Sequence, residues 1–275
     1  IKTSGIFKID GTIKGLITDT TIPKLNITIT SNKASFQYPN LPKSVENIVI
    51  DIKIKNETGR VDDTFVKIDN LTFKIDQDIF QSSAKIRNLN KNILVDANLD
   101  GILNLANISK AYPIKLENKL NRIIKAKLQT SFEMNAIKTN AFERIKSIGS
   151  INVINFVFTP ESLANPIAIS KAKIDFKPGT VTLNSFDATV GQSDLKATGT
   201  IDNLLGFLLS DKPLKGNFNV SSNLFQISDF MVETKDELEE KNPSEGLKIP
   251  AFLDCTIKTN AQTVLYDNLK LKNVS

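Results

Sequence analysis

Few side chains of this sequence are suited to catalysis. The stretch VGQSDL from Val190 to Leu195 resembles half of a nucleophile elbow around Ser193, but Leu195 stands where a second glycine belongs. The chain has no histidine, which removes the commonest general base, the commonest zinc ligand and every Ser-His or Cys-His pair. It also has no phosphate-binding glycine loop and no dinucleotide fingerprint. We therefore expect a protein that is not an enzyme and needs no cofactor.

Carboxylates cluster at a few places, and one thiol stands alone. Asp62 with Asp63, and Asp76 with Asp78, are close in sequence but do not form a calcium-loop pattern, so we interpret them as solvated turn residues. The acidic run at 236–240 is interpreted as a solvated loop rather than a cation site. Cys255 alternates with Leu253 and Ile257, which favours a buried small hydrophobe over a reactive thiol. No metal site is predicted.

Composition describes an ordinary folded chain. Its 275 residues are 40% hydrophobic and 24% charged, so disorder over most of the chain is not expected. The net charge of +5 is spread over many residues, unlike the clustered footprint of a nucleic-acid-binding protein, although attraction to an anionic membrane surface stays open. The longest apolar run, Leu204 to Leu209, is far shorter than a membrane span. Because the chain opens at Ile1 and has no leader, we expect an internal fragment of something longer.

The hydrophobic pattern has a period of two, which is typical of half-buried antiparallel strands. Ile48, Ile50, Ile52 and Ile54 alternate with mostly polar neighbours, and similar alternation recurs along the chain. Helical signals are short. An N-cap at Asn140 and a stop at Gly149 predict roughly two turns between them. Further short helices are expected at 105–112 and 224–231.

The sequence also repeats itself. The 25 residues from Phe65 match those from Thr180 without gaps, 115 positions later, and the match continues four residues out of step after a longer loop. A second match, from Ile29 to Ile257, lies 228 positions apart, close to two such periods, and the middle copy from Ile151 needs a small gap. We predict a first repeat at 1–120, a second at 121–232, a charged surface loop at 233–247 and the start of a third repeat at 248–275. The parity of the pattern slips between Ile68 and Leu71 and between Leu183 and Phe186, which predicts equivalent β-bulges.

The sheet implied by these strands is large. About seven strands in each full repeat and two in the fragment give roughly 16, and one sheet of that width would span about 75 Å. Its apolar face needs a cover that a few helical turns do not supply. Either the sheet closes as a sandwich or barrel, or it stays open with its apolar face covered by something else, for which acyl chains are suited. Small residues such as Ala84 and Gly199 either allow close packing or leave room for a ligand.

The predicted lining of the apolar face takes every second residue of the equivalent runs. It consists of Ile48, Ile50, Ile52, Ile54, Phe80, Ala84, Ile86, Val95, Ala97, Leu99, Leu195, Ala197, Gly199, Ile201, Leu214, Gly216, Phe218 and Val220.

Five motifs, in order, carry a family resemblance. The chain resembles the AsmA-like proteins of Gram-negative envelopes, and the resemblance covers nearly the whole length. The motifs are FQYPNLPKSVENIVIDIKI from Phe36, LDGILNLANISKAYPI from Leu99, NAFERIKSIGSI from Asn140, FDATVGQSDLKATGTIDNL from Phe186 and FLDCTIKTNAQTVLYDNLKLKNV from Phe252. They are strand-and-turn patterns with no catalytic signature.

The resemblance implies a fold, a place and an activity. The fold is all-β, an elongated and strongly curved antiparallel sheet of repeating β-groove units with a few short helices. The place is the periplasmic portion of an inner-membrane protein, held by an N-terminal anchor that this sequence does not contain. The AsmA-like family, with TamB-like and chorein-like bridge proteins, is associated with phospholipid movement between membranes and outer-membrane integrity. We thus expect phospholipid acyl chains as ligands, envelope proteins as partners and no nucleic acid.

One function from another class competes with this expectation. A structural or scaffolding β module, built from closed sandwiches, would assist outer-membrane protein assembly through protein contacts, without binding lipid. Copurifying phospholipid distinguishes the two.

Overall fold

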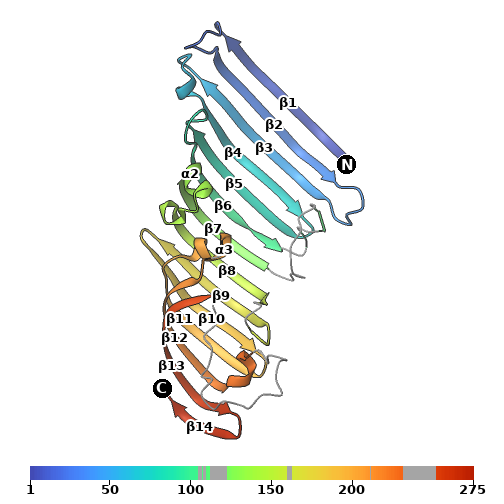
Figure 1. Cartoon of the computed structure of the whole chain (residues 1–275). Coiled ribbons are helices and arrows are strands. Elements are labelled where there is room, and N and C mark those ends of the chain that lie inside the picture. The colour runs from blue at the N-terminus through green and yellow to red at the C-terminus, as the bar shows by residue number, and fades with distance from the viewer. Residues whose placement is uncertain (105–106, 108–109, 112–122, 160–162, 211, 232–251) are drawn as a thin grey trace, which may run out of the picture. The chain divides into compact units, whose positions relative to one another are not determined.

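A computed structural model describes the chain except for residues 105–106, 108–109, 112–122, 160–162, 211 and 232–251 (Figure 1). The described chain is built from long strands and a few short helices. The strands are β1 (Lys2–Lys14), β2 (Lys24–Gln37), β3 (Val45–Asn56), β4 (Phe65–Ile75), β5 (Asp78–Arg87), β6 (Leu94–Asn104), β7 (Ile123–Glu133), β8 (Lys146–Phe158), β9 (Ile167–Lys177), β10 (Thr180–Val190), β11 (Ser193–Ile201), β12 (Leu214–Gln226), β13 (Leu253–Tyr266) and β14 (Leu269–Val274). The helices are α2 (Met134–Lys138), α3 (Leu204–Leu209) and the 3₁₀ turns η1 (Val61–Asp63), η2 (Phe142–Arg144) and η3 (Ile227–Phe230). Within the described residues, no helix has the length and apolar character needed to cross a membrane.

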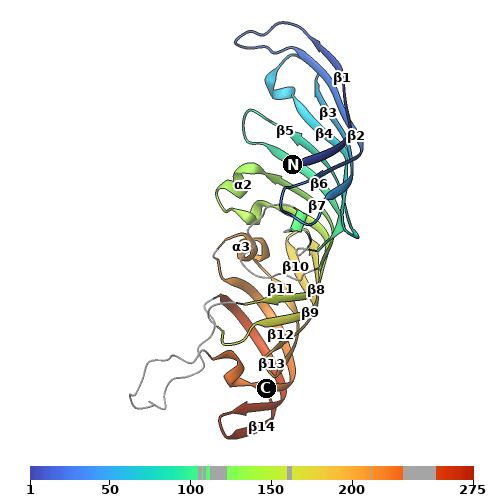
Figure 2. The ribbon, with the colours of Figure 1, turned by 90° about the vertical axis from the view of Figure 1, so that its right-hand side faces the viewer.

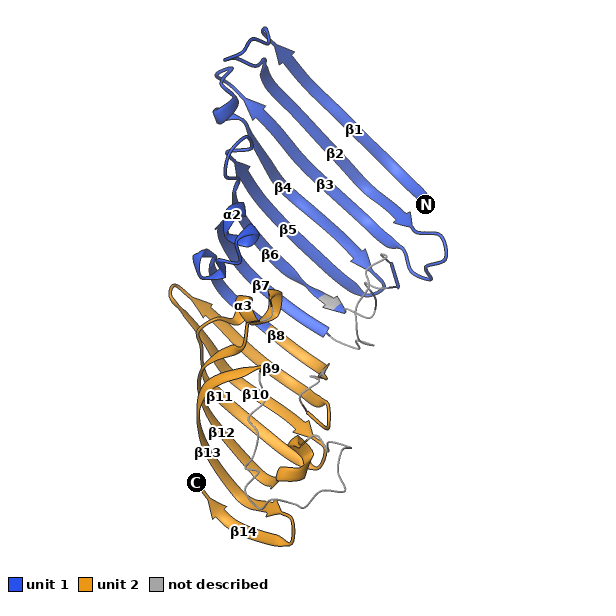
Figure 3. Cartoon of the chain, viewed as in Figure 1, with its two compact units in different colours: residues 1–151 blue, residues 152–275 orange. Residues whose placement is uncertain are grey.

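The strands form a mostly antiparallel sheet in the order of the sequence, from β1 to β14. Because β1 and β14 are the outer strands of this order, the sheet is open, and the closed alternative does not apply. The chain divides into two compact units, unit 1 (Ile1–Ile151) and unit 2 (Asn152–Ser275), coloured separately in Figure 3. The predicted repeat boundary at 120/121 and the predicted charged loop at 233–247 lie outside the described residues.

There are 14 strands in the described sheet, fewer than the roughly 16 expected. The difference arises from strand length. From β1 to β13 the strands have 9 to 14 residues, compared with the usual five or six, so each uses more of the chain.

Both predicted bulges are confirmed. The register of β4 against β5 shifts between Ile68 and Leu71, and that of β10 against β11 shifts between Leu183 and Phe186. Because β4 and β5 lie 115 positions before β10 and β11, the repeat seen in the sequence is also a repeat of strands and of their irregularities.

One strand pair breaks the antiparallel pattern. β12 and β13 run parallel, with Leu214 opposite Leu253 and Phe218 opposite Ile257. The sequence match places β13 on β2, which in unit 1 has the antiparallel strand β1 before it. In an antiparallel sheet, every second strand runs in the same direction, so removing the strand between two such strands makes them parallel neighbours. The parallel pair therefore corresponds to a repeat in which the sheet has no equivalent of β1 between β12 and β13.

Each strand pair in unit 1 separates its side chains into two faces. Cross-strand neighbours point to the same side of a sheet, so the register identifies the members of each face. One row across β2 to β7 contains Ile27, Ile54, Val66, Ile86, Val95 and Phe132. The row on the opposite side of the same strands contains Thr28, Lys53, Lys67, Lys85, Asp96 and Ser131. The described strands of unit 1 therefore form a sheet with an apolar face and a polar face.

The buried core of unit 1 occupies one end of the apolar face. Ala34, Val45, Ile48, Ile75 and Ala111 form it, each at most 9% exposed, and Phe36, Ile50 and Phe73 pack against it. The backbone N–H of Lys43 donates to the carbonyl of Lys110, which fixes the segment carrying Ala111 over this end. The rest of the apolar face lies outside this cluster.

The helix predicted between Asn140 and Gly149 is wrong in position. The structure has α2 before it, only the 3₁₀ turn η2 within it, and β8 from Lys146. Asn140 has a φ of 53°, so it forms a turn rather than an N-cap. Gly149 lies inside β8, where a Cβ atom would stand 2.0 Å from the Lys127 carbonyl oxygen, so this glycine allows close strand approach. For 224–231 the prediction is partly right, since η3 covers Ile227–Phe230 but Leu224–Gln226 belongs to β12. Most of 105–112 lies outside the described residues.

Candidate functional site: the apolar faces of the two units

The predicted lining residues of unit 1 lie on one face. Ile52, Ile68, Ala84 and Ala97 form a second row beside the one described above, and Ile50, Leu71, Ser82 and Leu99 form a third. Phe80 lies opposite Gly101. These three rows, which we call the apolar face of unit 1, contain Ile50, Ile52, Ile54, Ala84, Ile86, Val95, Ala97 and Leu99 of the predicted set.

Most of this face is half-buried, although it lies outside the core cluster. The side chains of Ile52, Ile54, Ile86 and Val95 are neither buried nor fully exposed. Neighbours in the same sheet shield their flanks, while the described residues place no second layer over them. Ile48 differs, because it belongs to the core cluster and is 9% exposed. The accessible part of the apolar face is therefore narrower than the predicted one.

Unit 2 repeats this arrangement. Leu183, Gly199, Phe218 and Ile257 form one row of its apolar face, and Phe186, Ala197, Val220 and Thr259 form the next. Ile201 and Gly216 are opposite one another and both buried, as is Phe218 at 8% exposure. Leu195 and Leu214 are half-buried. Burial along the first row of unit 2 is uneven, because Leu183 and Phe218 are buried whereas Ile257 is 45% exposed.

At three glycines of the apolar faces, a neighbouring phenylalanine ring occupies the space that a side chain would need. A Cβ atom on Gly199 would lie 2.9 Å from the ring of Phe218, and one on Gly216 would also lie 2.9 Å from that ring. In unit 1 a Cβ atom on Gly101 would lie 3.0 Å from the ring of Phe80. At these positions the glycine serves close packing. By contrast, Ala84 and Ala97 face one another across β5 and β6 and stay half-buried.

Several charges on the polar face of unit 1 form ion pairs. The carboxylate of Asp69 lies 2.6 Å from the ammonium group of Lys53 and 2.6 Å from that of Lys67. Hydrogen bonds from these two lysines hold the pKa of Asp69 below its ordinary value. Arg87 donates to Asp96 at 2.6 Å. Such exposed pairs contribute little to stability, but they keep this face hydrated.

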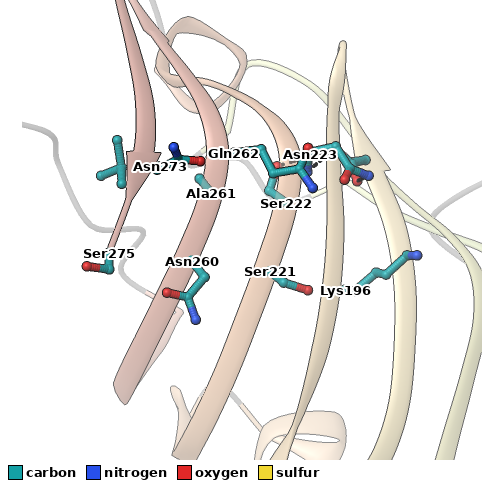
Figure 4. A pocket seen from close by; sticks show the side chains of 11 residues that line it. Lys196, Ser221, Ser222, Asn223, Asn260, Ala261, Gln262, Asn273 and Ser275 are labelled. Atoms are coloured by element: carbon teal, nitrogen blue, oxygen red, sulfur yellow. Dashed lines mark hydrogen bonds between the residues drawn. The ribbon is translucent and has the colours of Figure 1, made fainter.

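The polar face of unit 2 has its own concavity. A pocket of about 390 Å³ is lined by Lys196, Ser221 and Asn260, which are cross-strand neighbours, together with other polar residues (Figure 4). Most of the residues that line it carry amide or hydroxyl groups.

Ser193, the centre of the elbow-like sequence, organises a turn. It is fully buried, and its hydroxyl donates to Asp229 Oδ2 at 2.7 Å. The same carboxylate oxygen accepts from the backbone N–H groups of Gln192 and Ser193, both at 2.9 Å. Asp229 therefore fastens the β10–β11 turn to η3. Asp78 of the first repeat, which is aligned with Ser193, accepts from Asn107 at 2.9 Å.

Cys255 lies on the apolar face of unit 2 opposite Gly216 and is half-buried. Burial raises the pKa of its thiol, so little of it is thiolate at neutral pH. Among the residues with described placement, no three His, Cys, Asp or Glu side chains are arranged to hold a metal ion.

Several members of the apolar faces were not in the predicted set. They lie on the intervening strands and include Ile27, Ile29, Val66, Ile68, Leu71, Leu128 and Phe132 in unit 1 and Ile174, Leu183 and Phe186 in unit 2. Alternation in ITIT of β2 and in KAKLQTSF of β7 marks some of them. Only the register shows that they complete the same rows.

Comparison of the chain with models of protein families, with curated proteins and with solved structures found no match.

Proposed function

We propose that this chain is a segment of a periplasmic envelope protein that shields phospholipid acyl chains on the apolar faces of its sheet. In this role it supports lipid movement between the inner and outer membranes and thereby outer-membrane integrity. The observation that carries the proposal is the apolar face of unit 1, whose rows of apolar side chains lie on the side of the sheet opposite the charged face.

The physical argument concerns what such a face requires. Apolar surface left in water is unfavourable by about 25 cal/mol per Å². Hydrocarbon relieves this without directional hydrogen bonds, and the face offers none to a more polar ligand, because its side chains there are mainly Ile, Val, Leu and Ala. Many interchangeable contacts also allow a chain to slide rather than lock in place. Acyl chains therefore match the face better than a ligand with fixed polar groups.

The place in the envelope rests on the AsmA-like motifs. They support a periplasmic location, an inner-membrane anchor elsewhere in the full protein and envelope proteins as partners. The scaffolding alternative acts through protein contacts and needs no lipid.

Native mass spectrometry after gentle purification tests the proposal. We expect copurified phospholipid in the wild-type protein and a loss of most of it in Ala97→Glu, which places a charge in the middle of the apolar face. Asn98→Glu is the matched control, because Asn98 is the next residue of β6 and lies on the polar face opposite Ser83. Circular dichroism confirms that both variants fold.

The outcomes separate the two functions. Equal lipid loading in Ala97→Glu and Asn98→Glu would contradict binding on the apolar face. A folded wild-type protein that carries no lipid and takes up none from vesicles would favour the scaffold.

A further inference from the structure

The loop between β1 and β2 carries two of the most exposed apolar side chains in unit 1. Leu16 is 81% exposed and Ile17 is 78% exposed. In Figure 2 the blue β1–β2 connection extends beyond the ends of these strands. These two adjacent side chains do not pack against the described fold, which leaves them free to contact a partner.

The loop is held in shape by its own hydrogen bonds. Thr18 donates its backbone N–H to the carbonyl of Thr21, and the Thr18 hydroxyl accepts from the N–H groups of Thr20 and Thr21. The N–H of Ile22 donates to the Gly59 carbonyl at 2.8 Å, which connects the β1–β2 loop to the β3–β4 loop. Leu16 and Ile17 precede this turn and are therefore presented by a structured loop.

Two lysines form the base of the loop. Lys14 and Lys24 are exposed and lie directly opposite one another at the ends of β1 and β2. Like charges at facing positions of two strands repel, and within the described residues neither lysine has an ion-pair partner. Asp19, further along the loop, is the one acidic residue between them. Anions near Lys14 and Lys24 would relieve the repulsion.

An apolar tip with a cationic base is the arrangement by which peripheral proteins bind anionic bilayers. The apolar residues enter the boundary between headgroups and acyl chains, while lysines contact phosphate groups at the surface. We propose that the β1–β2 loop is a membrane-contact site, with Leu16 and Ile17 entering an anionic bilayer and Lys14 and Lys24 contacting its headgroups. This role is independent of lipid binding on the apolar faces and places the chain against the membrane surface.

Vesicle flotation with the whole chain tests this proposal. We expect binding to vesicles of phosphatidylglycerol and phosphatidylcholine, reduced about tenfold or more in Leu16→Ser/Ile17→Ser. The variant Lys14→Gln/Lys24→Gln should lose the preference for these vesicles over pure phosphatidylcholine. The control is Ile79→Ser/Leu269→Ser, which removes two apolar side chains of 55% and 57% exposure from β5 and β14 and should bind as the wild type does.

Three results would overturn the inference. The first is a wild-type chain that does not bind anionic vesicles, and the second is unchanged binding in Leu16→Ser/Ile17→Ser. The third is a change in the oligomeric mass of that variant without a change in vesicle binding, which would assign the loop to a protein contact. Copurified lipid is measured in the same samples. If a loop variant loses vesicle binding but keeps its copurified lipid, the effect belongs to the loop alone. If vesicle binding is retained but no lipid copurifies, the result counts against the proposed function.

Discussion

At the scale of single residues, carboxylates in unit 2 act as anchors for the backbone. Asp194 accepts from the N–H groups of Asn223 and Leu224, at 2.9 and 2.8 Å, and from the side chain of Asn223. Burial acts to raise the pKa of this carboxyl, but the hydrogen bonds outweigh it and leave the pKa below its ordinary value of 3.8. The ionised form of Asp194 is therefore the one that the fold stabilises.

The pKa shift gives a prediction with a definite sign. A carboxyl whose pKa is lowered by folding contributes stability above its unfolded pKa, and this contribution disappears as the pH falls through the folded pKa. We expect Asp194→Ala to destabilise the protein by about 2 kcal/mol at neutral pH, because two backbone N–H groups lose their acceptor. The deficit should shrink below about pH 4. Urea denaturation at neutral and acidic pH measures it, and a deficit that does not change with pH would contradict this role.

A second prediction at this scale concerns Gly199. A Cβ atom there would lie 2.1 Å from the Asn217 carbonyl oxygen, and backbone cannot move aside as easily as a side chain. Gly199→Ala should therefore cost roughly 1–3 kcal/mol of unfolding free energy. Thr198→Ala, the adjacent exposed position on the other face, is the control and should change stability by less than about 0.5 kcal/mol. Equal denaturation midpoints for the two variants would show that the strands can separate at no cost.

At the scale of elements, single buried polar side chains shape the long connections. Asn56 is 1% exposed at the end of β3. Its amide group donates to the Arg60 carbonyl and the Thr64 hydroxyl, and its oxygen accepts from the N–H groups of Thr58 and Gly59. All the polar atoms of this side chain are used to form the β3–β4 loop.

Removal of Asn56 should therefore loosen the loop as a whole. We expect Asn56→Ala to destabilise unit 1 by about 2–4 kcal/mol, since buried loop N–H and C=O groups lose their partners. Hydrogen exchange should rise across 57–64 more than in β3 itself. Asn26→Ala, an exposed asparagine on the polar face of β2, serves as control. Uniform exchange changes along the unit would show instead that Asn56 stabilises the sheet generally.

At the scale of the whole molecule, the described strands form an open sheet, and each unit has an apolar face and a polar face. A globular domain usually covers such an apolar face with helices or a second sheet. The described helices lie at strand ends, and the stacked rings of Phe225 and Phe230, 4.7 Å apart, likewise pack where β12 meets η3. Among the described residues, no helix or second sheet forms a layer over the middle of the apolar face of unit 1, which is the arrangement that the proposed function requires.

The one cysteine offers a readout of this ligand. Because Cys255 lies on the apolar face of unit 2, bound acyl chains should slow its alkylation several-fold compared with delipidated protein. The reaction is followed by mass spectrometry at mildly alkaline pH, since burial raises the pKa of the thiol. Equal alkylation rates with and without lipid would exclude acyl chains from the face around Cys255, and denatured protein provides the reference rate.

The sequence by itself determined the all-β architecture and the two equivalent bulges. Alternation at Ile48–Ile54 and the parity slips at Ile68 and Leu183 follow from local geometry, since side chains of a strand must alternate between faces. The short helices were less predictable. The signals around Asn140 and Gly149 are shared by caps, turns and close strand approaches, and neighbouring strands decide among these.

What only the tertiary structure decided is which residues belong together. The strand register shows that Val66 and Phe132 complete the predicted rows. Side-chain packing shows that Ile48 belongs to a buried core cluster and that the ring of Phe218 lies beside Gly199. The strand pairing also established that the sheet stays open and that β12 and β13 are parallel. The physical reason is that alternation within a strand determines only which side chains point to each face of the sheet. The neighbours of each side chain depend on how distant strands pair, and the sequence of one strand does not contain the register of its partner.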